Sequence, residues 1–152
     1  MAVSGIEIFS DGACSGNPGP GAFGTVMTFK SHRKELTEAF KHTTNNRMEL
    51  MGVIAGLEAI KEEGNEVTCV TDSKYVVESI EKGWVFNWMK TGFKGKKNED
   101  LWRRLITAYK RQNVKMKWIK GHNGHPMNEF CDQLAVKSCQ NGPWQIDTGC
   151  TS

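Results

Sequence analysis

The order in which apolar residues change their spacing along the chain constrains the fold more than any other feature. Three short apolar runs, residues 6–10, 22–29 and 34–40, come first and are joined by short loops, which is typical of an antiparallel meander. Apolar residues then recur at helical spacing from Met48 to Ile60. Strand-like and helix-like segments follow one another after that. We therefore predict an α/β protein with a five-stranded mixed sheet, three antiparallel strands followed by parallel additions, flanked by helices.

The remaining elements are predicted from the same patterns. Thr43 or Thr44 can cap the long helix, and Gly64 lies just past its end. Segment 84–97 is basic and aromatic and has no clear period. We predict strands at 66–71 and 114–120 and helices at 73–82, 98–111 and 127–138. The turn at 31–33 is predicted as a hairpin, and the glycine-rich residues 12–24 as a turn between strands.

At 152 residues the chain has the length of one domain. We expect that domain to span residues 1–139 and the polar residues 140–152 to form a poorly ordered tail. No apolar stretch is long enough for a membrane span, and the first residues do not resemble a secretory signal, so we expect a cytoplasmic location. The five cysteines are odd in number and form no C-x-x-C pair, which favours free thiols over disulfides or a zinc site.

Two of the predicted strands end in an aspartate. A crossover connection should place strand 66–71 parallel to and near strand 6–10, so Asp11 and Asp72 would lie side by side at one sheet edge. Two neighbouring carboxylates resist full ionisation unless a cation is present, and hard cations such as Mg²⁺ or Mn²⁺ prefer oxygen ligands. Taken alone, Asp11 could be a turn residue before Gly12, and Asp72 could cap helix 73–82.

Several segments, in order, resemble bacterial type 1 ribonuclease H. They are FSDGACSGNPG at 9–19, TNNRMEL at 44–50, TDS at 71–73, and KGHNGHP at 120–126 continuing through Asn128 and Glu129 to Asp132. The match runs from about residue 6 to residue 138. It implies a ribonuclease H-like fold and an endonuclease that hydrolyses the RNA strand of RNA/DNA hybrids. Two Mg²⁺ ions per site, with Mn²⁺ possible, should then leave 5′-phosphate and 3′-hydroxyl ends. We expect a monomer without an obligate protein partner.

The resemblance also assigns the catalytic residues. It implies that the metal-binding carboxylates are Asp11, Glu49, Asp72 and Asp132, and that His122 helps to activate water or release product. Glu49 lies early in the long helix and can point over the sheet end, although it could also be a first-turn acid facing the helix dipole. His125 is interpreted as structural, and His32 and His42 as surface residues.

Recognition of a hybrid requires the 2′-hydroxyl of one strand to be read, and amide groups suit that task. The resemblance assigns this role to backbone around 12–17, which includes Cys14, and to Asn17, Asn45 and Asn46. Thr44 and Asn98 resemble residues that grip a DNA-strand phosphate. Asn45 and Asn98 could instead be helix caps.

Positive charge near these residues points to a polyanionic partner. Segment 84–97 resembles the family's basic protrusion, several residues shorter than usual, and supplies predicted phosphate contacts from Lys90, Lys94, Lys96 and Lys97. Lys74 stands where many relatives have a neutral amide, and its charge either tightens phosphate contact or competes with a metal. Trp84, Trp88 and Trp102 are predicted to serve in packing and not in base stacking.

Two other functions use a similar plan. Integrases, transposases and junction resolvases share a sheet with clustered acids, and a hybrid-binding module could have lost catalysis. The GNPGPG and TNNRME segments argue against the first class, and the presence of all four carboxylates and His122 argues against the second.

Overall fold

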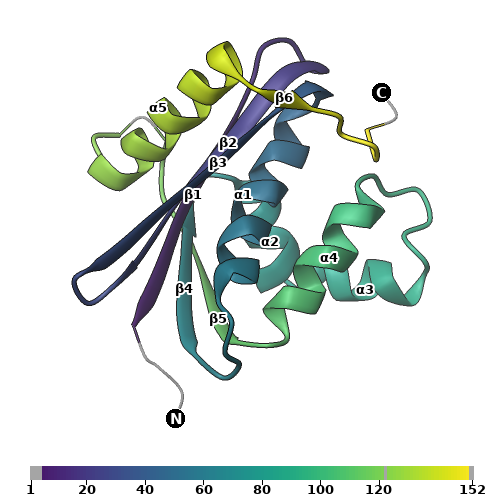
Figure 1. Ribbon diagram of the computed structural model, residues 1–152. Helices are drawn as coiled ribbons and strands as arrows, with labels where there is room; N and C mark the ends of the chain where they lie inside the picture. Colours follow the sequence, from purple (N-terminus) through teal and green to yellow (C-terminus); the bar gives the residue numbers. More distant parts are fainter. Residues whose placement is uncertain (1–4, 122, 151–152) are drawn as a thin grey trace.

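Six strands form one sheet in the order β5-β4-β1-β2-β3-β6, seen in a computed structural model that describes residues 5–121 and 123–150 (Figure 1). The strands are β1 (Ile6–Cys14), β2 (Gly19–Phe29), β3 (His32–Thr43), β4 (Glu66–Thr71), β5 (Asn113–Trp118) and β6 (Trp144–Gln145). β1, β2 and β3 are antiparallel neighbours, and the other three pair parallel to their neighbours. The predicted mixed α/β architecture is confirmed, with β4 parallel to β1.

The sheet has one strand more than the five predicted. β6 pairs with the outer edge of β3, with Ala39 opposite Trp144 and Phe40 opposite Gln145. A strand of two residues is too short to show an alternating pattern in the sequence. Its pairing arises because β3 offers an open edge of backbone donors and acceptors in the folded chain.

β1 and β2 are longer than the apolar runs that predicted them. Their ladder continues through the glycine-rich segment as far as the pair Cys14 and Gly21. Glycine and proline are locally unfavourable in strands, but pairing between two neighbouring strands outweighs that local preference. The loop between β2 and β3 consists of Lys30 and Ser31 alone, so the predicted hairpin at 31–33 is displaced.

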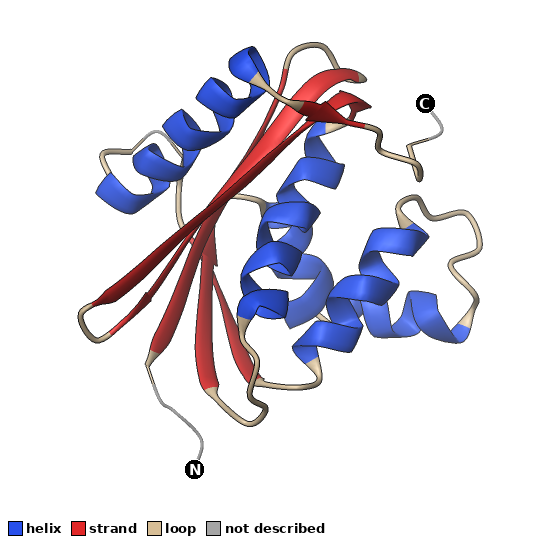
Figure 2. Cartoon of the chain, viewed as in Figure 1, coloured by secondary structure: helices blue, strands red, loops and turns tan. Residues whose placement is uncertain are grey.

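Among the described residues, five helices cover the two faces of the sheet (Figures 1 and 2). One face carries α1 (Asn45–Ala59), α2 (Lys74–Glu81), α3 (Trp84–Lys90) and α4 (Glu99–Tyr109). α1 packs directly on β1 and β2, and α4 packs on α1. α5 (Pro126–Asn141) crosses the other face against the same two strands. The sheet is therefore buried on both sides at its centre.

The helix ends follow local chemistry. The Thr44 hydroxyl accepts a hydrogen bond from the Arg47 N–H at 3.3 Å and starts α1, as one of the two predicted caps. α1 ends at Ala59, several residues before Gly64, because Ile60 already has extended backbone. α3 was not predicted, since its seven residues are too few to establish a helical period.

Two apolar clusters fill the space on either side of the sheet. Ile8, Leu50 and Trp102 belong to the cluster under α1, α2 and α4. Phe9 and Cys131 belong to the smaller cluster under α5. Because successive residues of β1 are buried on opposite faces, polar side chains at the end of this strand are enclosed as well. All five cysteines are free thiols, as predicted.

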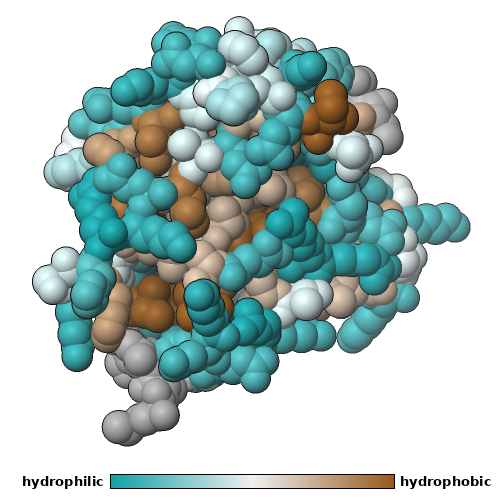
Figure 3. Space-filling view, viewed as in Figure 1, coloured by the Kyte–Doolittle hydropathy of each residue, from teal (hydrophilic) through white to brown (hydrophobic). Residues whose placement is uncertain are grey.

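The surface is mainly polar, and hydrophilic side chains surround smaller areas of apolar surface on the face in Figure 3. Among the helices of the described residues, none has the length and apolar character that crossing a membrane would require.

The C-terminal residues differ most from the prediction. α5 runs to Asn141, beyond the expected end at 138, and β6 follows it. Asp147 is bound to Arg47 of α1 by an ion pair of 2.7 Å. Residues in the range 140–150 thus contact the domain through the end of α5, β6 and Asp147, contacts that their polar composition did not predict. Long-range contacts of this kind leave no local periodicity in the sequence.

Candidate active site

The parallel pairing of β1 and β4 sets Asp11 and Asp72 side by side. Phe9 pairs with Val70, so continuing that register by two residues places Asp11 opposite Asp72. Asp72 follows directly after β4, whereas Asp11 lies within β1 and not beyond its end. The N-cap of α2 is Ser73, whose hydroxyl accepts from the Val76 N–H, so Asp72 is not the helix cap.

α1 brings a third carboxylate to this place. One oxygen from each of Asp11, Glu49 and Asp72 lies within 4.8 Å of the others. The absence of a side chain at Gly12 allows this approach, because a Cβ there would lie 2.8 Å from the Glu49 backbone nitrogen. Glu49 is beyond the first turn of α1, so it does not act as a first-turn acid. Three elements that are distant in the sequence thus converge on one point.

Burial and mutual repulsion shift the proton equilibria of these acids. Burial, followed by the charges of Asp72 and Asp132, raises the pKa of Asp11 to about 8. Burial, followed by the charges of Asp11 and Asp72, raises the pKa of Glu49 well above its ordinary value. A hydrogen bond between the Asp11 and Glu49 carboxyls lowers the pKa of Asp11 and raises that of Glu49. Ionising the whole set is therefore unfavourable unless positive charge is added.

The carboxylate set fits a divalent cation. Glu49 Oε1 is buried and, among the residues that the structure describes, finds no hydrogen-bond partner. An unsatisfied buried acceptor costs about 1–3 kcal/mol. Hard cations take carboxylate oxygens as ligands, so an ion held here would satisfy that oxygen and offset the repulsion.

Asp132 lies at the same place but farther from the centre. It is half-buried on α5, and its charge helps to raise the pKa of Asp11. The oxygens that lie within 4.8 Å of one another belong to the other three acids. The four predicted carboxylates thus surround one cleft, while three of them form its tight cluster.

This acidic cleft has a volume of about 480 Å³. Its lining is almost entirely polar, and it opens between the end of the sheet and the start of α1 and α2. Besides the four acids it is lined by Gly12, Asn45, Asn46, Ser73, Lys74, Tyr75 and Gly121.

A larger neighbouring cleft of about 920 Å³ contains most of the predicted substrate contacts. Asn46 lines both clefts, so the two adjoin at the start of α1. The neighbouring cleft is lined by Asn17, Pro18, Thr44, Asn46, Arg47, Lys96, Lys97, Asn98, Glu99, Asp100, Arg103, Gly149 and Cys150.

The predicted contact residues are held by neighbours within these clefts. The Asn17 side-chain oxygen accepts from the Asn45 backbone N–H at 2.9 Å, which joins the loop after β1 to the start of α1. Asn98 precedes α4 with φ 66°, but its side chain makes no cap hydrogen bond. The Cys14 thiol lies against backbone carbonyls, including that of Thr43 at 3.4 Å, so the thiol itself is directed into the protein.

The basic residues fall into two groups. Lys96 and Lys97 line the neighbouring cleft, whereas Lys90 and Lys94 are exposed on the same segment and line neither cleft. Lys74 is exposed at the mouth of the acidic cleft, where its Nζ lies 4.8 Å from the centre of the Trp118 ring.

The predicted aromatic and histidine roles have mixed outcomes. Trp102 is fully buried and Trp88 packs against the core, as predicted, but Trp84 is 42% exposed. The His125 ring accepts from the Asn128 N–H at 3.4 Å and caps α5, which confirms a structural role. His122 lies outside the described residues.

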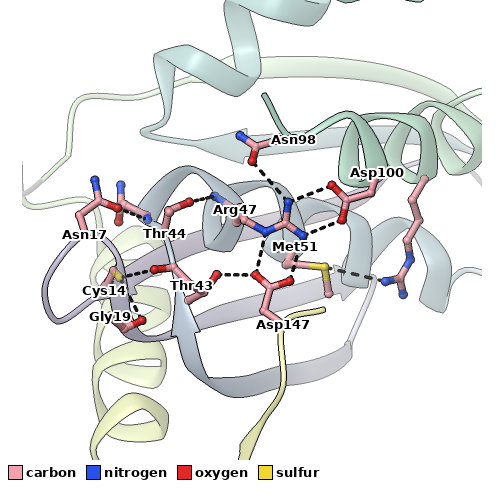
Figure 4. A network of polar contacts seen from close by, with 12 residues as sticks. Cys14, Asn17, Gly19, Thr43, Thr44, Arg47, Met51, Asn98, Asp100 and Asp147 are labelled. Carbon is pink, nitrogen blue, oxygen red and sulfur yellow. Dashed lines mark hydrogen bonds and ion pairs between the residues drawn. The ribbon is translucent and has the colours of Figure 1, made fainter. Parts of the chain in front are cut away.

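Three residues that the sequence did not single out organise the neighbouring cleft. Arg47 of α1 is 2% exposed, and its guanidinium binds both Asp100 of α4 and Asp147 of the C-terminal segment (Figure 4). Arg47 lies inside the TNNRME segment, and Asp100 was visible only as an acid in a first turn. Nothing local in the sequence signals that the three side chains meet.

Comparison with known proteins gives consistent matches over this region. The family model of RNase H matches residues 4–140. Ribonuclease H of Desulforamulus reducens is 52% identical over 147 residues, covering 93% of this chain and 92% of that protein. Ribonuclease H of Pectobacterium carotovorum is 49% identical over 149 residues, covering 95% of each. The crystal structure of LC9-RNase H1, a type 1 RNase H with the type 2 active-site motif, aligns with a TM-score of 0.80 and 28% identity, covering 92% of this chain and 74% of that one.

Proposed function

Because this chain belongs to the ribonuclease H family, we propose that it hydrolyses the RNA strand of RNA/DNA hybrids with Mg²⁺ held by Asp11, Glu49, Asp72 and Asp132. The observation that carries the proposal is the meeting of three carboxylates from β1, α1 and the end of β4 within 4.8 Å. Such a cluster stores repulsion that serves no structural purpose, and a cation would relieve it.

The metal supplies the chemistry that the side chains lack. Two Mg²⁺ ions held in the cleft would polarise the scissile phosphate and lower the pKa of an attacking water, so that hydrolysis leaves a 5′-phosphate and a 3′-hydroxyl. The cluster contains no side-chain nucleophile, and the buried thiol of Cys131 has a pKa raised by burial to about 12, which makes it inert.

The side chains hold and orient the reacting groups. Asp11 and Glu49 are the buried members and fix the depth of the site, whereas Asp72 and Asp132 are partly exposed toward the cleft. We expect the RNA strand to lie along the acidic cleft. His122, by its resemblance to the family pattern, would move a proton or assist product release.

The neighbouring cleft would hold the DNA strand. Thr44 and Asn98 would grip a phosphate there, and Lys96 and Lys97 lie at the same wall to neutralise others. Asn46 lines both clefts and Asn45 lines the acidic cleft, so their amide groups are suited to reading the 2′-hydroxyl across the minor groove. Lys90 and Lys94 would contact phosphates farther along the duplex.

A magnesium titration of cleavage tests the proposal. Labelled RNA/DNA hybrid, duplex DNA and duplex RNA are each incubated with the protein, and the products are separated on a denaturing gel. We expect cleavage of the RNA strand of the hybrid alone, dependent on Mg²⁺ and lost on chelation. Terminal labelling with a kinase, with and without phosphatase, identifies the product ends.

Two other results would each contradict the proposal. Comparable cleavage of duplex DNA would indicate an enzyme of the integrase or resolvase class. Binding of hybrid without cleavage at any Mg²⁺ or Mn²⁺ concentration would indicate a binding module. Glu63→Gln, at an exposed acid outside both clefts, is the control for a general loss of negative charge.

A further inference from the structure

One buried guanidinium joins three separate parts of the neighbouring cleft. The Arg47 Nε and Nη2 groups donate to the two Asp147 oxygens at 2.7 and 2.9 Å. Nη1 and Nη2 donate to the two Asp100 oxygens at 2.9 and 2.7 Å. Nη1 also donates to the Asn98 side-chain oxygen at 3.4 Å (Figure 4). The five N–H donors of Arg47 are thus all used, which fixes the plane of the group.

Asp147 is held from a second side. Its Oδ2 accepts from the Thr43 hydroxyl at 2.7 Å as well as from Arg47. Thr43 is the last residue of β3 and immediately precedes Thr44, one of the two proposed phosphate contacts. The side chain of Asp147 is 10% exposed, so these interactions are little screened by solvent. The C-terminal segment thereby fixes the backbone beside Thr44.

Asn98, the other proposed phosphate contact, is oriented through the same guanidinium. Its side-chain oxygen accepts from Arg47, and its amide group donates to the Tyr75 hydroxyl at 3.2 Å. That hydroxyl also accepts from the Trp102 indole N–H at 2.7 Å. With both ends of the amide held, one amide hydrogen is left for a ligand.

The C-terminal segment fits this network closely. A Cβ at Gly149 would lie 2.5 Å from Arg47 Nη2 and would also collide with the Asp100 carboxylate, so only glycine can occupy the position without displacement. The Cys150 N–H donates to the Asp147 carbonyl at 3.2 Å, which turns the chain back over the cleft. Gly149 and Cys150 then form part of the cleft wall.

We propose that Asp147 is a positioning residue for the DNA strand, acting through Arg47 on Asn98 and through Thr43 on Thr44. The inference rests on the proposed function, in which the neighbouring cleft binds a DNA-strand phosphate. Asp147 itself does not touch the nucleic acid. Without its charge, Arg47 Nε and one Nη2 hydrogen lose their charged acceptor, so the plane of the guanidinium is held from one side only and its Nη1 contact with the Asn98 oxygen is no longer fixed. A merely structural ion pair would stabilise the fold without influencing substrate affinity.

The test compares Asp147→Asn and Asp147→Glu with wild type, at a temperature well below the melting temperature of each protein. For Asp147→Asn we expect the KM for hybrid to rise about tenfold, the loss of roughly 1.4 kcal/mol of binding, while kcat stays within about twofold. Asp147→Glu keeps the charge and should recover part of the affinity. The control is Glu58→Gln, which removes the ion pair with Arg104 outside both clefts and should leave KM unchanged.

A modified substrate separates positioning from stability. A hybrid with neutral methylphosphonate linkages in its DNA strand lacks the charge that Thr44 and Asn98 would grip. We expect wild type to bind it more weakly than native hybrid, and Asp147→Asn to show no additional loss on it. An Asp147→Asn protein with a lower melting temperature but an unchanged KM for native hybrid would overturn the proposal.

Other outcomes are also decisive. If Asp147→Asn does not fold, Thr43→Val removes only the hydroxyl that binds Asp147 and should raise KM by a smaller factor, so an unchanged KM there would overturn the proposal. Failure of the wild-type protein to cleave any hybrid with Mg²⁺ would instead count against the proposed function. The two failures are therefore distinguishable.

Discussion

The acidic cleft and the Arg47 network beside the neighbouring cleft each contain buried carboxylate, but the negative charge is uncompensated in the first and compensated in the second. In the acidic cleft, Asp11 and Glu49 face other acids, and the pKa of each is raised. In the neighbouring cleft, burial alone would raise the pKa of Asp147, but hydrogen bonds from Arg47 and Thr43 outweigh it and hold that pKa below its ordinary value. The Arg47 hydrogen bond likewise lowers the pKa of Asp100.

The opposite pKa shifts distinguish a site whose acids need a bound cation from a site whose acids are already paired with Arg47. Uncompensated buried acids lower the stability of the metal-free protein, a cost that persists at sites where function requires it. Compensated acids stabilise the fold and fix the geometry of their neighbours. The acidic cluster can therefore bind cations, whereas the Arg47 network stabilises the surface of the neighbouring cleft.

The largest expected effect comes from removing one charge of the acidic cluster. Asp11→Asn keeps the size of the side chain but weakens metal positioning, so turnover should fall by roughly 10³-fold or more. Hybrid affinity should remain or improve, because repulsion of the phosphate declines. Single-turnover cleavage and a binding assay in chelator measure the two effects. Turnover close to that of wild type would show that the cluster does not hold the catalytic metal.

The same substitution should stabilise the metal-free protein. A carboxyl with a raised folded-state pKa binds its proton more tightly in the folded protein, so wild-type stability declines as pH rises from about 4 toward the Asp11 pKa of about 8. Asp11→Asn removes that decline. In chelator at about pH 8.5 its melting temperature should exceed that of wild type by about 2–8 °C. The gain in melting temperature should vanish near pH 4. A variant with a lower melting temperature than wild type at every pH would contradict the hypothesis that repulsion among the acids destabilises the metal-free protein.

The compensated cluster should respond with the opposite sign. Asp147→Asn should lower the free energy of unfolding by about 1–3 kcal/mol at pH 7, since it leaves Arg47 partly unpaired. A carboxyl with a lowered folded-state pKa contributes stability above its ordinary pKa, and the contribution is lost as pH falls through the folded-state value. The difference between wild type and variant should therefore shrink below about pH 4. Urea unfolding between pH 7 and pH 3 measures it, and a constant difference would exclude the ion pair as its cause.

The smallest expected effect concerns Lys74, the cation that lines the acidic cleft among the residues the structure describes. Lys74 is the first residue of α2, where the helix dipole disfavours positive charge. Lys74→Gln should raise the KM for hybrid by about 2–5-fold and reduce the slope of log affinity against log salt by about 0.7–0.9.

Lys82→Gln is the matched control for Lys74→Gln, because Lys82 flanks the same helix and pairs with Glu78 outside the cleft. An unchanged salt slope in Lys74→Gln, together with weaker Mg²⁺ binding measured by calorimetry, would indicate that Lys74 balances the acids and does not contact phosphate.

Local patterns in the sequence determined most of the helices and strands and two of the four carboxylates of the site, Asp11 and Asp72. The change from strand-like to helix-like periods predicted the α/β fold. The position of Asp11 and Asp72 after two predicted parallel strands predicted that the two side chains lie close together. That inference succeeded because the parallel register of β1 and β4 places Asp11 opposite Asp72, although Asp11 lies within β1 and not beyond its end. The contribution of Glu49 came from family resemblance, and its packing through Gly12 needed the structure.

Only the tertiary structure decided what depends on contacts between distant segments. The polar C-terminal residues show no hydrophobic periodicity, so neither β6 nor the contact of Asp147 with Arg47 could be predicted from them. The hydrogen bond between Arg47 and Asp147 depends on how α1, β3 and the C-terminal segment pack. A local sequence pattern cannot predict a contact between residues that are so far apart in the chain. The sequence thus determined which residues can bind a metal. The packing of remote segments decided which of these acids lie together, and it decided that the Arg47 guanidinium is paired with Asp147.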